Sequence, residues 1–110
     1  MGIKVLKWHP QALDEFVAIL QYCEEMFGWN TARKVRAQFE SRLSILQLFP
    51  NMGRDEDLLK NKDGLKYRSL ALPPTKIIYT IHSSYIYIHA LWNTRRNPDD
   101  LSEILKDREL

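Results

Sequence analysis

Residues 76–92 read KIIYTIHSSYIYIHALW, and this stretch carries the clearest strand signals in the chain. Isoleucine and tyrosine dominate it, and both residue types favour the half-buried, pleated surface of a β-sheet. Alternation of side chains that face opposite sides of the sheet predicts one strand over Lys76–His82. The enrichment in Ile and Tyr predicts a second over Tyr85–Trp92, with Ser83 and Ser84 forming a tight turn between them. An antiparallel hairpin is therefore the predicted centre of the fold.

The residues before this hairpin have the spacing of two helices. A short strand over Ile3–Trp8 is followed by Pro10, which suits the first turn of a helix. Gly28 can end that helix, and residues 30–31 (Asn-Thr) can cap a second helix that ends at Pro50. Because so few residues separate them, the helices must form an antiparallel hairpin. The predicted inward faces are Leu13, Phe16, Val17, Leu20, Cys23 and Phe27 in the first helix, and Ala32, Val35, Phe39, Leu43, Leu46 and Phe49 in the second.

Residues 50–64 are predicted to form a polar connection that leads into a further strand over Leu65–Leu70. Near the C-terminus, the Asn-Pro pair at residues 97–98 can begin a possible short helix with an apolar side. The order β-α-α-β-β-β predicts an α+β fold, in which the helical hairpin packs on one face of an antiparallel sheet. The other face would be exposed or would await a partner. The apolar side of the C-terminal helix would consist of Leu101, Ile104 and Leu105.

The chain has 110 residues, which is enough for one domain with a real core and too few for two. No apolar run approaches the ~18 residues of a membrane span, so we expect a cytoplasmic protein with no membrane contact. The single cysteine, Cys23, excludes an internal disulfide and is predicted to be a buried structural thiol. His9, His82 and His89 lack zinc-ligand spacing and no glycine-rich phosphate loop is present, so we expect neither a metal nor a cofactor. The oligomeric state stays open.

Positive charge is concentrated in the strand-rich part of the chain. Between Gly64 and Asn97 there is no Asp or Glu, although the whole chain has a net charge of only +2. A positive surface attracts an anionic partner. The alternative is a short sheet face that lacks acids by chance, since charge is often segregated by segment in small domains. The basic residues of the segment are Lys66, Arg68, Lys76, Arg95 and Arg96.

Four segments form an ordered set of motifs. LFPNMGR at residues 48–54 follows the second helix, and the Tyr-Arg pair at residues 67–68 opens the next strand. KIIYTI at residues 76–81 and IYIHALWNTRRN at residues 86–97 make up the last two strands. In this order they resemble the toxins of the RelE/ParE superfamily of bacterial type II toxin–antitoxin modules. ParE-type members end the last strand in histidine-glycine-arginine-arginine-aspartate; this chain keeps both arginines but has Asn93, Thr94 and Asn97 at the other positions.

The resemblance implies a growth-inhibiting toxin, of the kind associated with plasmid stabilisation, that a cognate antitoxin holds inactive. It leaves two targets open. RelE-type members cleave mRNA in the ribosome with basic side chains and a general acid or base, whereas ParE-type members inhibit DNA gyrase and need no catalytic side chains. No Tyr or His follows Trp92, where RelE-type members have one, so we favour the ParE type. The alternatives are a ribosome-dependent mRNA endonuclease and a non-toxic relative that only binds an antitoxin.

Seven residues are candidates for contact with the target or with nucleic acid. The forked donors of Arg54 and Arg68 suit phosphate or carboxylate groups, but either arginine could instead fix the loop through a salt bridge to Asp55 or Glu56. Trp92 could stack on a base or fill the core. The C-terminal arginines could be a solvated pair that the following acidic residues balance. The seven candidates are Arg54, Lys66, Arg68, Lys76, Trp92, Arg95 and Arg96.

Only the endonuclease alternative requires a catalytic site, and the candidates for it are His89 and Arg68. Attack by a 2′-hydroxyl group needs a base, cations around the phosphate and an acid for the leaving oxygen. Histidine titrates near neutral pH and can fill the acid or base role. In a regular strand, His89 shares a face with Tyr85, Tyr87 and Leu91. The catalytic role requires this face to be exposed; if it is buried, His89 is a packing residue.

Overall fold

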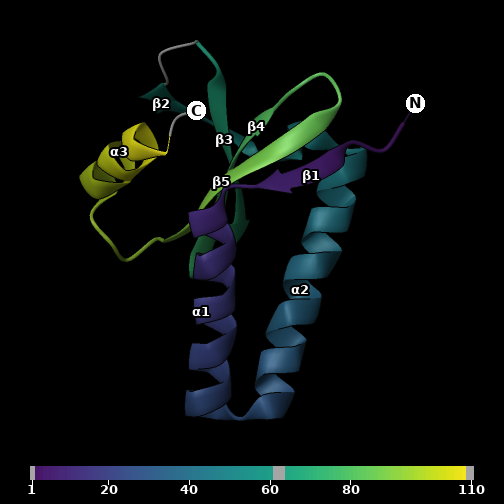
Figure 1. Ribbon diagram of the computed structural model, residues 1–110, viewed down its shortest axis with the longest axis vertical. Coiled ribbons are helices and arrows are strands. Elements are labelled where there is room, and N and C mark those ends of the chain that lie inside the picture. The colour runs from purple at the N-terminus through teal and green to yellow at the C-terminus, as the bar shows by residue number, and fades with distance from the viewer. Residues whose placement is uncertain (1, 61–63, 109–110) are drawn as a thin grey trace.

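The structure is a computed structural model that describes residues 2–60 and 64–108. At its centre the predicted hairpin is present as β4 (Thr75–Ile81) and β5 (Tyr85–Asn93), which pair antiparallel. β3 (Lys66–Leu72) pairs antiparallel with the other edge of β4. The three strands predicted for the second half of the chain are therefore confirmed (Figure 1).

The first predicted strand is β1 (Val5–Trp8), which lies beside β5 and runs parallel to it. The sheet is therefore mixed, with the strand order β1-β5-β4-β3-β2. The helical hairpin and three strands separate β1 from β5 along the chain, so no short turn forces the two strands to be antiparallel.

The polar connection predicted over residues 50–64 contains an additional strand, β2 (Arg54–Lys60), at the edge of the sheet. Three consecutive acidic residues at positions 55–57 have low strand propensity, which hid the strand in the sequence. Pairing with β3 overrides that propensity, because Asp55 lies opposite Arg68 in the register. Charged side chains are also suited to an edge strand, where they discourage pairing with other chains.

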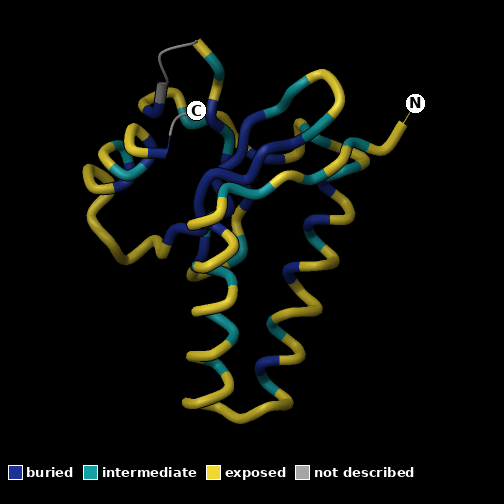
Figure 2. Tube along the Cα trace, viewed as in Figure 1, coloured by how far each residue is buried: buried dark blue, intermediate teal, exposed yellow. Residues whose placement is uncertain are grey.

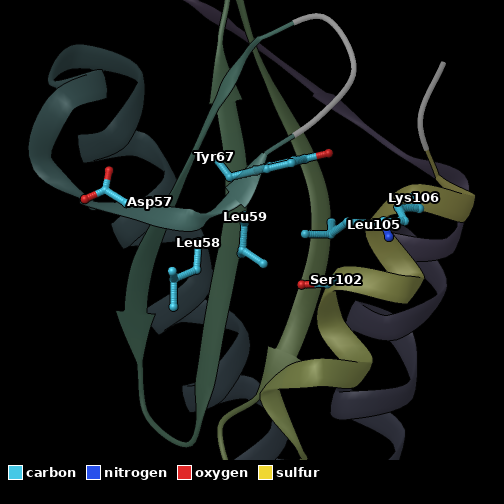
Figure 3. A pocket seen from close by; sticks show the side chains of 7 residues that line it. All are labelled: Asp57, Leu58, Leu59, Tyr67, Ser102, Leu105 and Lys106. Carbon is cyan, nitrogen blue, oxygen red and sulfur yellow. The ribbon is translucent and has the colours of Figure 1, made fainter.

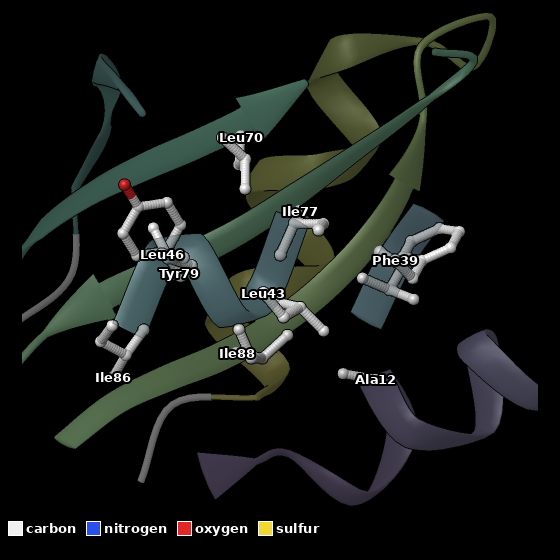
Figure 4. Close-up of a cluster of buried hydrophobic side chains, with 10 residues drawn as sticks. Ala12, Phe39, Leu43, Leu46, Leu70, Ile77, Tyr79, Ile86 and Ile88 are labelled. Carbon is white, nitrogen blue, oxygen red and sulfur yellow. The ribbon is translucent and has the colours of Figure 1, made fainter. Parts of the chain in front are cut away.

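Two helices cover one face of the sheet, as predicted (Figure 1). α1 (Pro10–Phe27) is capped by His9, whose Nδ1 accepts a hydrogen bond of 3.1 Å from the Gln11 N–H. α2 (Trp29–Leu48) follows after Gly28 alone, and the φ of 92° at this residue favours glycine. Figure 4 shows the core between the helices and the sheet, which consists of Ala12, Phe39, Leu43, Leu46, Leu70, Ile77, Tyr79, Ile86, Ile88 and Leu91.

The inward face of α1 agrees with the prediction only in part: Phe16 packs against the core, as predicted. Leu13, Val17 and Phe27 are exposed, whereas Ala12 is fully buried in the core. Residues 12, 16 and 19 have the same helical spacing as residues 13, 17 and 20, so periodicity cannot choose between these faces. The predicted face of α2 is confirmed except at Phe49, which is exposed. Figure 2 shows that the far half of the helical hairpin extends beyond the sheet and is mostly exposed.

α3 (Pro98–Asp107) confirms the predicted C-terminal helix. Asn97 caps it, with Oδ1 accepting a hydrogen bond of 3.0 Å from the Asp99 N–H. α3 packs on the sheet face opposite to the helical hairpin, because Ile78 of its cluster alternates with Ile77 and Tyr79 of the main core. The face that was expected to be exposed or to await a partner is thus partly covered by the chain itself. This second cluster consists of Leu59, Tyr67, Ile78, Ala90, Trp92, Leu101 and Leu105.

Candidate functional site

Arg68 holds the segment between α2 and β2. Its side chain is 17% exposed. Nη1 donates to Asp55 Oδ1 over 2.6 Å, and Nη2 donates to the carbonyl oxygens of Asn51, over 2.8 Å, and of Gly53. The salt bridge that the sequence offered as the alternative role is therefore present, and Arg68 acts as a clamp on this segment.

Tyr79 fixes the same segment from the sheet. Its hydroxyl group donates to the Pro50 carbonyl oxygen over 2.7 Å and accepts from the Gly53 N–H over 3.1 Å. A Cβ atom at Gly53 would overlap the Tyr79 hydroxyl and the Ser69 carbonyl oxygen, so this position requires glycine. The proline, glycine, arginine and tyrosine of the sequence motifs thus form one interlocked structural unit.

Arg68 and His89, the two candidate catalytic residues, lie on opposite faces of the sheet. Arg68 is opposite Tyr79 in the register, and Tyr79 packs in the core beneath the helices. Consecutive residues of a strand point to opposite faces. Tyr67 accordingly lies on the α3 side, where its ring centroid is 5.1 Å from that of His89. The structure therefore does not bring the two residues together.

A β-bulge in β5 places His89. Ile78 pairs with Ala90 whereas Tyr79 pairs with Ile88, so β5 has one residue more than β4 at this point. The extra residue moves Leu91 to the face that packs on the helices. The prediction that His89 and Leu91 share a face was wrong for this reason.

His89 is a packing residue that is only 6% exposed. Its Nε2 lies 2.8 Å from Thr80 Oγ1, and the same hydroxyl lies 2.8 Å from His82 Nε2. The rings of Tyr67 and Tyr87 stand edge-on to the imidazole. The exposed surface that acid–base catalysis by His89 requires is absent from this conformation.

Burial also controls the protonation of the histidines. It lowers the pKa of His89 to about 4, and the nearby charges of His82, His9 and Arg108 act in the same direction. Burial lowers the pKa of His9 and of His82 as well, assisted by Arg108 at the first and by Lys7 at the second. All three imidazoles are therefore largely neutral near pH 7.

Three of the predicted binding residues meet at one end of the α3 face. Lys76 lies opposite Trp92 in the register, and its Nζ is 3.5 Å from Glu56 Oε2. Trp92 is buried in the second cluster, so it fills the core, as the alternative role required. The Arg96 guanidinium lies over its ring, 4.3 Å from the centroid.

The other basic candidates lie elsewhere. Arg54 begins β2 and Lys66 begins β3, and both are exposed. Arg95 lines a groove of about 600 Å³ between the two long helices and the β3–β4 turn, whose walls are mainly apolar. Cys23, predicted to be a buried thiol, is partly exposed and lines the same groove. The seven candidates therefore do not form a single patch.

Sequence reasoning missed Arg108, which is only 7% exposed. Its Nη1 and Nη2 each donate to the Glu15 carboxylate over 2.9 Å, and its Nε donates to Gln11 Oε1 over 3.0 Å. Nη1 also donates to the His89 carbonyl oxygen over 3.0 Å. No local pattern links two residues that are 93 positions apart, so no sequence signal could have found this pair.

No group of three His, Cys, Asp or Glu residues within the described ranges could hold a metal ion. In the same part of the chain, no helix has the length and apolar character needed to cross a membrane.

Comparison with known proteins agrees with the arrangement of the elements. The family model of the ParE toxin of type II toxin-antitoxin system, parDE, matches residues 6–98, from β1 to the first residue of α3. A chain in a solved structure of the chromosomal ParDE TA system from P. aeruginosa has a similar fold, with a TM-score of 0.64 and 20% identity over 83% of this chain and 96% of that chain. No curated protein matches the sequence significantly. Because the family model matches well over half of its residues, the chain belongs to the ParE toxin family of type II toxin–antitoxin systems.

Proposed function

We propose that this toxin inhibits growth in the cytoplasm by binding DNA gyrase without catalysis, and that a cognate antitoxin neutralises it. The observation that carries the choice of target is the separation of Arg68 and His89 by the sheet. Cleavage of RNA needs a base and a cation around the same phosphate group. A clamped arginine on one face and a buried, neutral histidine on the other do not meet that requirement.

The turn after β5 is the proposed contact with gyrase. Arg95 and Arg96 are exposed there, and exposed residues on turns of a rigid scaffold are well placed for binding. The Thr94 N–H and hydroxyl both donate to the Pro74 carbonyl oxygen, over 2.9 and 3.1 Å. Asn93 Oδ1 accepts from the Arg95 N–H over 2.9 Å. The turn is therefore held in one conformation before it meets a partner, which reduces the entropy cost of binding.

The groove that Arg95 lines is the proposed site for a segment of the antitoxin. Its walls include Ile19, Phe39 and Leu72, and Arg95 is its charged lining residue. These features suit an apolar segment that carries an Asp or Glu side chain for the guanidinium group. Occupation of the groove would also engage Arg95, so the antitoxin and gyrase would compete for the same arginine.

Two assays run in parallel test the proposed target. Purified toxin should inhibit DNA supercoiling by gyrase, and its induction in cells should leave mRNA intact. Replacing both Arg95 and Arg96 by Ala should weaken the inhibition at least tenfold, since charge-assisted hydrogen bonds are each worth about 1.5–3 kcal/mol. The double replacement of Arg33 and Arg36 by Ala is the matched control, because it removes the same charge from the exposed side of α2. Cleaved mRNA with unaffected supercoiling would establish the endonuclease alternative instead.

The antitoxin proposal has its own test. The product of the neighbouring gene should raise the melting temperature of the toxin, because a ligand present at 100 times its dissociation constant stabilises by about 2.7 kcal/mol. Arg95→Ala should reduce that rise. If the melting temperature does not change at any concentration of the neighbouring protein, that protein is not the antitoxin.

A further inference from the structure

α3 is attached to the sheet by few side chains. The match to the ParE family ends at residue 98, so this helix lies beyond the shared part of the chain. Leu101 and Leu105 are buried in the second cluster, and Ile104 is partly buried against it. A helix of 10 residues is too short to be stable alone in water, so α3 is helical only while it is docked.

Arg108 makes the other attachment, which we call the latch: Arg108 with Gln11, Glu15 and the His89 carbonyl oxygen. The Glu15 carboxylate also accepts a hydrogen bond of 3.0 Å from the Leu91 N–H. One carboxylate thus connects α1, β5 and the end of α3. The side chain of Glu15 is 25% exposed, so water can replace Arg108 as its partner.

The packing between these two attachments is open. A cavity of about 380 Å³ lies between α3 and the strands β2 and β3, and Figure 3 shows Leu59 and Tyr67 on one side of it and Leu105 on the other. Residues 94–97, which connect β5 to α3, are all exposed. The helix therefore has free space beside it, and it can turn about the exposed connection between Arg96 and Asn97, just beyond the hydrogen bonds that fix the turn after β5.

We propose that α3 is a hinged cover on the sheet, and that the chain has an open form in which the latch is released and the face around Tyr67 and His89 is exposed. The main core does not oppose this opening. Ile77, Tyr79 and the helical hairpin lie on the opposite face of the sheet and keep their apolar packing when α3 leaves. α1 loses only the hydrogen bonds of Gln11 and Glu15 to Arg108. α3 is thus a separate unit of local unfolding, of the kind that exchanges its amide hydrogens without unfolding of the whole chain.

Opening changes the chemistry of the covered face. The charge of Arg108 moves away and water reaches the imidazole, and both changes raise the pKa of His89 from about 4 toward 6.5. The rings of Tyr67 and Trp92, which pack with Leu101 and Leu105, become accessible in the same step. Only in the open form does His89 have the exposure that proton transfer to a ligand requires. The position of α3 therefore controls whether a ligand can reach His89.

Hydrogen exchange of the full-length protein in increasing urea tests the proposal, with β4 amides as the internal reference. In the wild type, α3 amides should exchange faster than β4 amides, through an opening that depends only weakly on urea. Glu15→Gln and Arg108→Gln should each increase α3 exchange on the order of 10–100-fold, from the usual strength of charge-assisted hydrogen bonds. Lys106→Gln, which removes one charge from an exposed position of the same helix, should exchange like the wild type. Protected β4 amides show that each variant is folded.

Titration of His89 by NMR in Glu15→Gln gives an independent readout. Glutamine keeps the acceptor for the Leu91 N–H and leaves Arg108 charged, so in a closed protein the pKa of His89 stays at about 4. More frequent opening should raise this pKa toward 6.5. The proposal is overturned if wild-type α3 amides exchange with the same urea dependence as β4 amides, or if the pKa of His89 in Glu15→Gln stays at about 4. Neither readout uses growth inhibition, so failure here is distinct from failure of the gyrase proposal.

Discussion

Replacement of Arg68 by Ala should destabilise the fold, because, of the two roles that the sequence left open for Arg68, the structure shows the salt bridge that fixes the loop. The guanidinium donates to the Asp55 carboxylate and to the carbonyl oxygens of Asn51 and Gly53. The substitution removes all three bonds at once. It also frees the segment that precedes β2, which Tyr79 then holds alone.

The expected loss of unfolding free energy follows from the exposure of each group that is bonded to Arg68. The Asp55 side chain is 50% exposed, and exposed ion pairs contribute only about 0–1 kcal/mol. The two carbonyl oxygens contribute more, because hydrogen bonds to charged groups are worth about 1.5–3 kcal/mol each and are not additive when one side chain makes both. We therefore expect Arg68→Ala to lower the free energy of unfolding by about 2–3 kcal/mol. Asp55→Ala should lower it by less than about 1 kcal/mol.

Urea unfolding followed by tryptophan fluorescence, together with a growth assay, checks this prediction. The m-value should stay constant, so that the shift of the midpoint reports stability alone. Lys66→Ala is the control, because Lys66 is exposed on the same strand and such changes stay within about 0.5 kcal/mol. The clamp argument is refuted if the free energy of unfolding of Arg68→Ala lies within that margin of the wild-type value and the variant no longer inhibits growth. Arg68 would then contact the target.

Three further predictions concern other parts of the molecule. Gly53→Ala should lower the free energy of unfolding by about 1–3 kcal/mol in the same urea assay, because the new methyl group overlaps the Tyr79 hydroxyl. An unchanged midpoint would show that the segment around Gly53 shifts to accommodate the methyl group. The double replacement of Arg95 and Arg96 by Ala should leave the melting temperature within a few degrees and still relieve growth inhibition, and full toxicity would exclude this turn as the target contact. In the folded chain the pKa of His89 is about 4, so between pH 6.5 and pH 4 the unfolded chain binds a proton at His89 that the folded chain does not bind. The free energy of unfolding therefore falls as the pH falls. The difference in free energy of unfolding between the wild type and His89→Gln should therefore change by about 3 kcal/mol over this range. Parallel profiles of unfolding free energy against pH would contradict the lowered pKa.

The sequence could identify the candidate residues but not their arrangement. It contains the basic residues and the histidine that RNA cleavage would need, and it also contains Asp55, the acid that pairs with Arg68. Whether Arg68 and His89 meet depends on which face of the sheet each occupies. A shift of one residue inverts the face, and the bulge beside His89 introduces such a shift in β5.

Local patterns in the sequence determined most of the elements of this protein. Enrichment in Ile and Tyr was sufficient for β4 and β5. Capping and stop residues were sufficient for the helices, because these signals act over a few neighbouring residues. The ordered motifs were sufficient for the family, since the residues that clamp the loop at Gly53 are the same residues that define the motifs.

Tertiary structure alone decided which faces are buried and which distant residues meet. The rotation of α1 that buries Ala12 and exposes Leu13 was one of them, because both faces have helical spacing and only packing against the sheet distinguishes them. The strand β2 was another, because pairing with β3 outweighed the poor propensity of its acidic residues. The latch of Arg108 on Glu15 was a third, since it joins the two ends of the chain. Contacts between distant residues leave no periodic trace in a single sequence, whereas they determine which faces are covered and which side chains can meet.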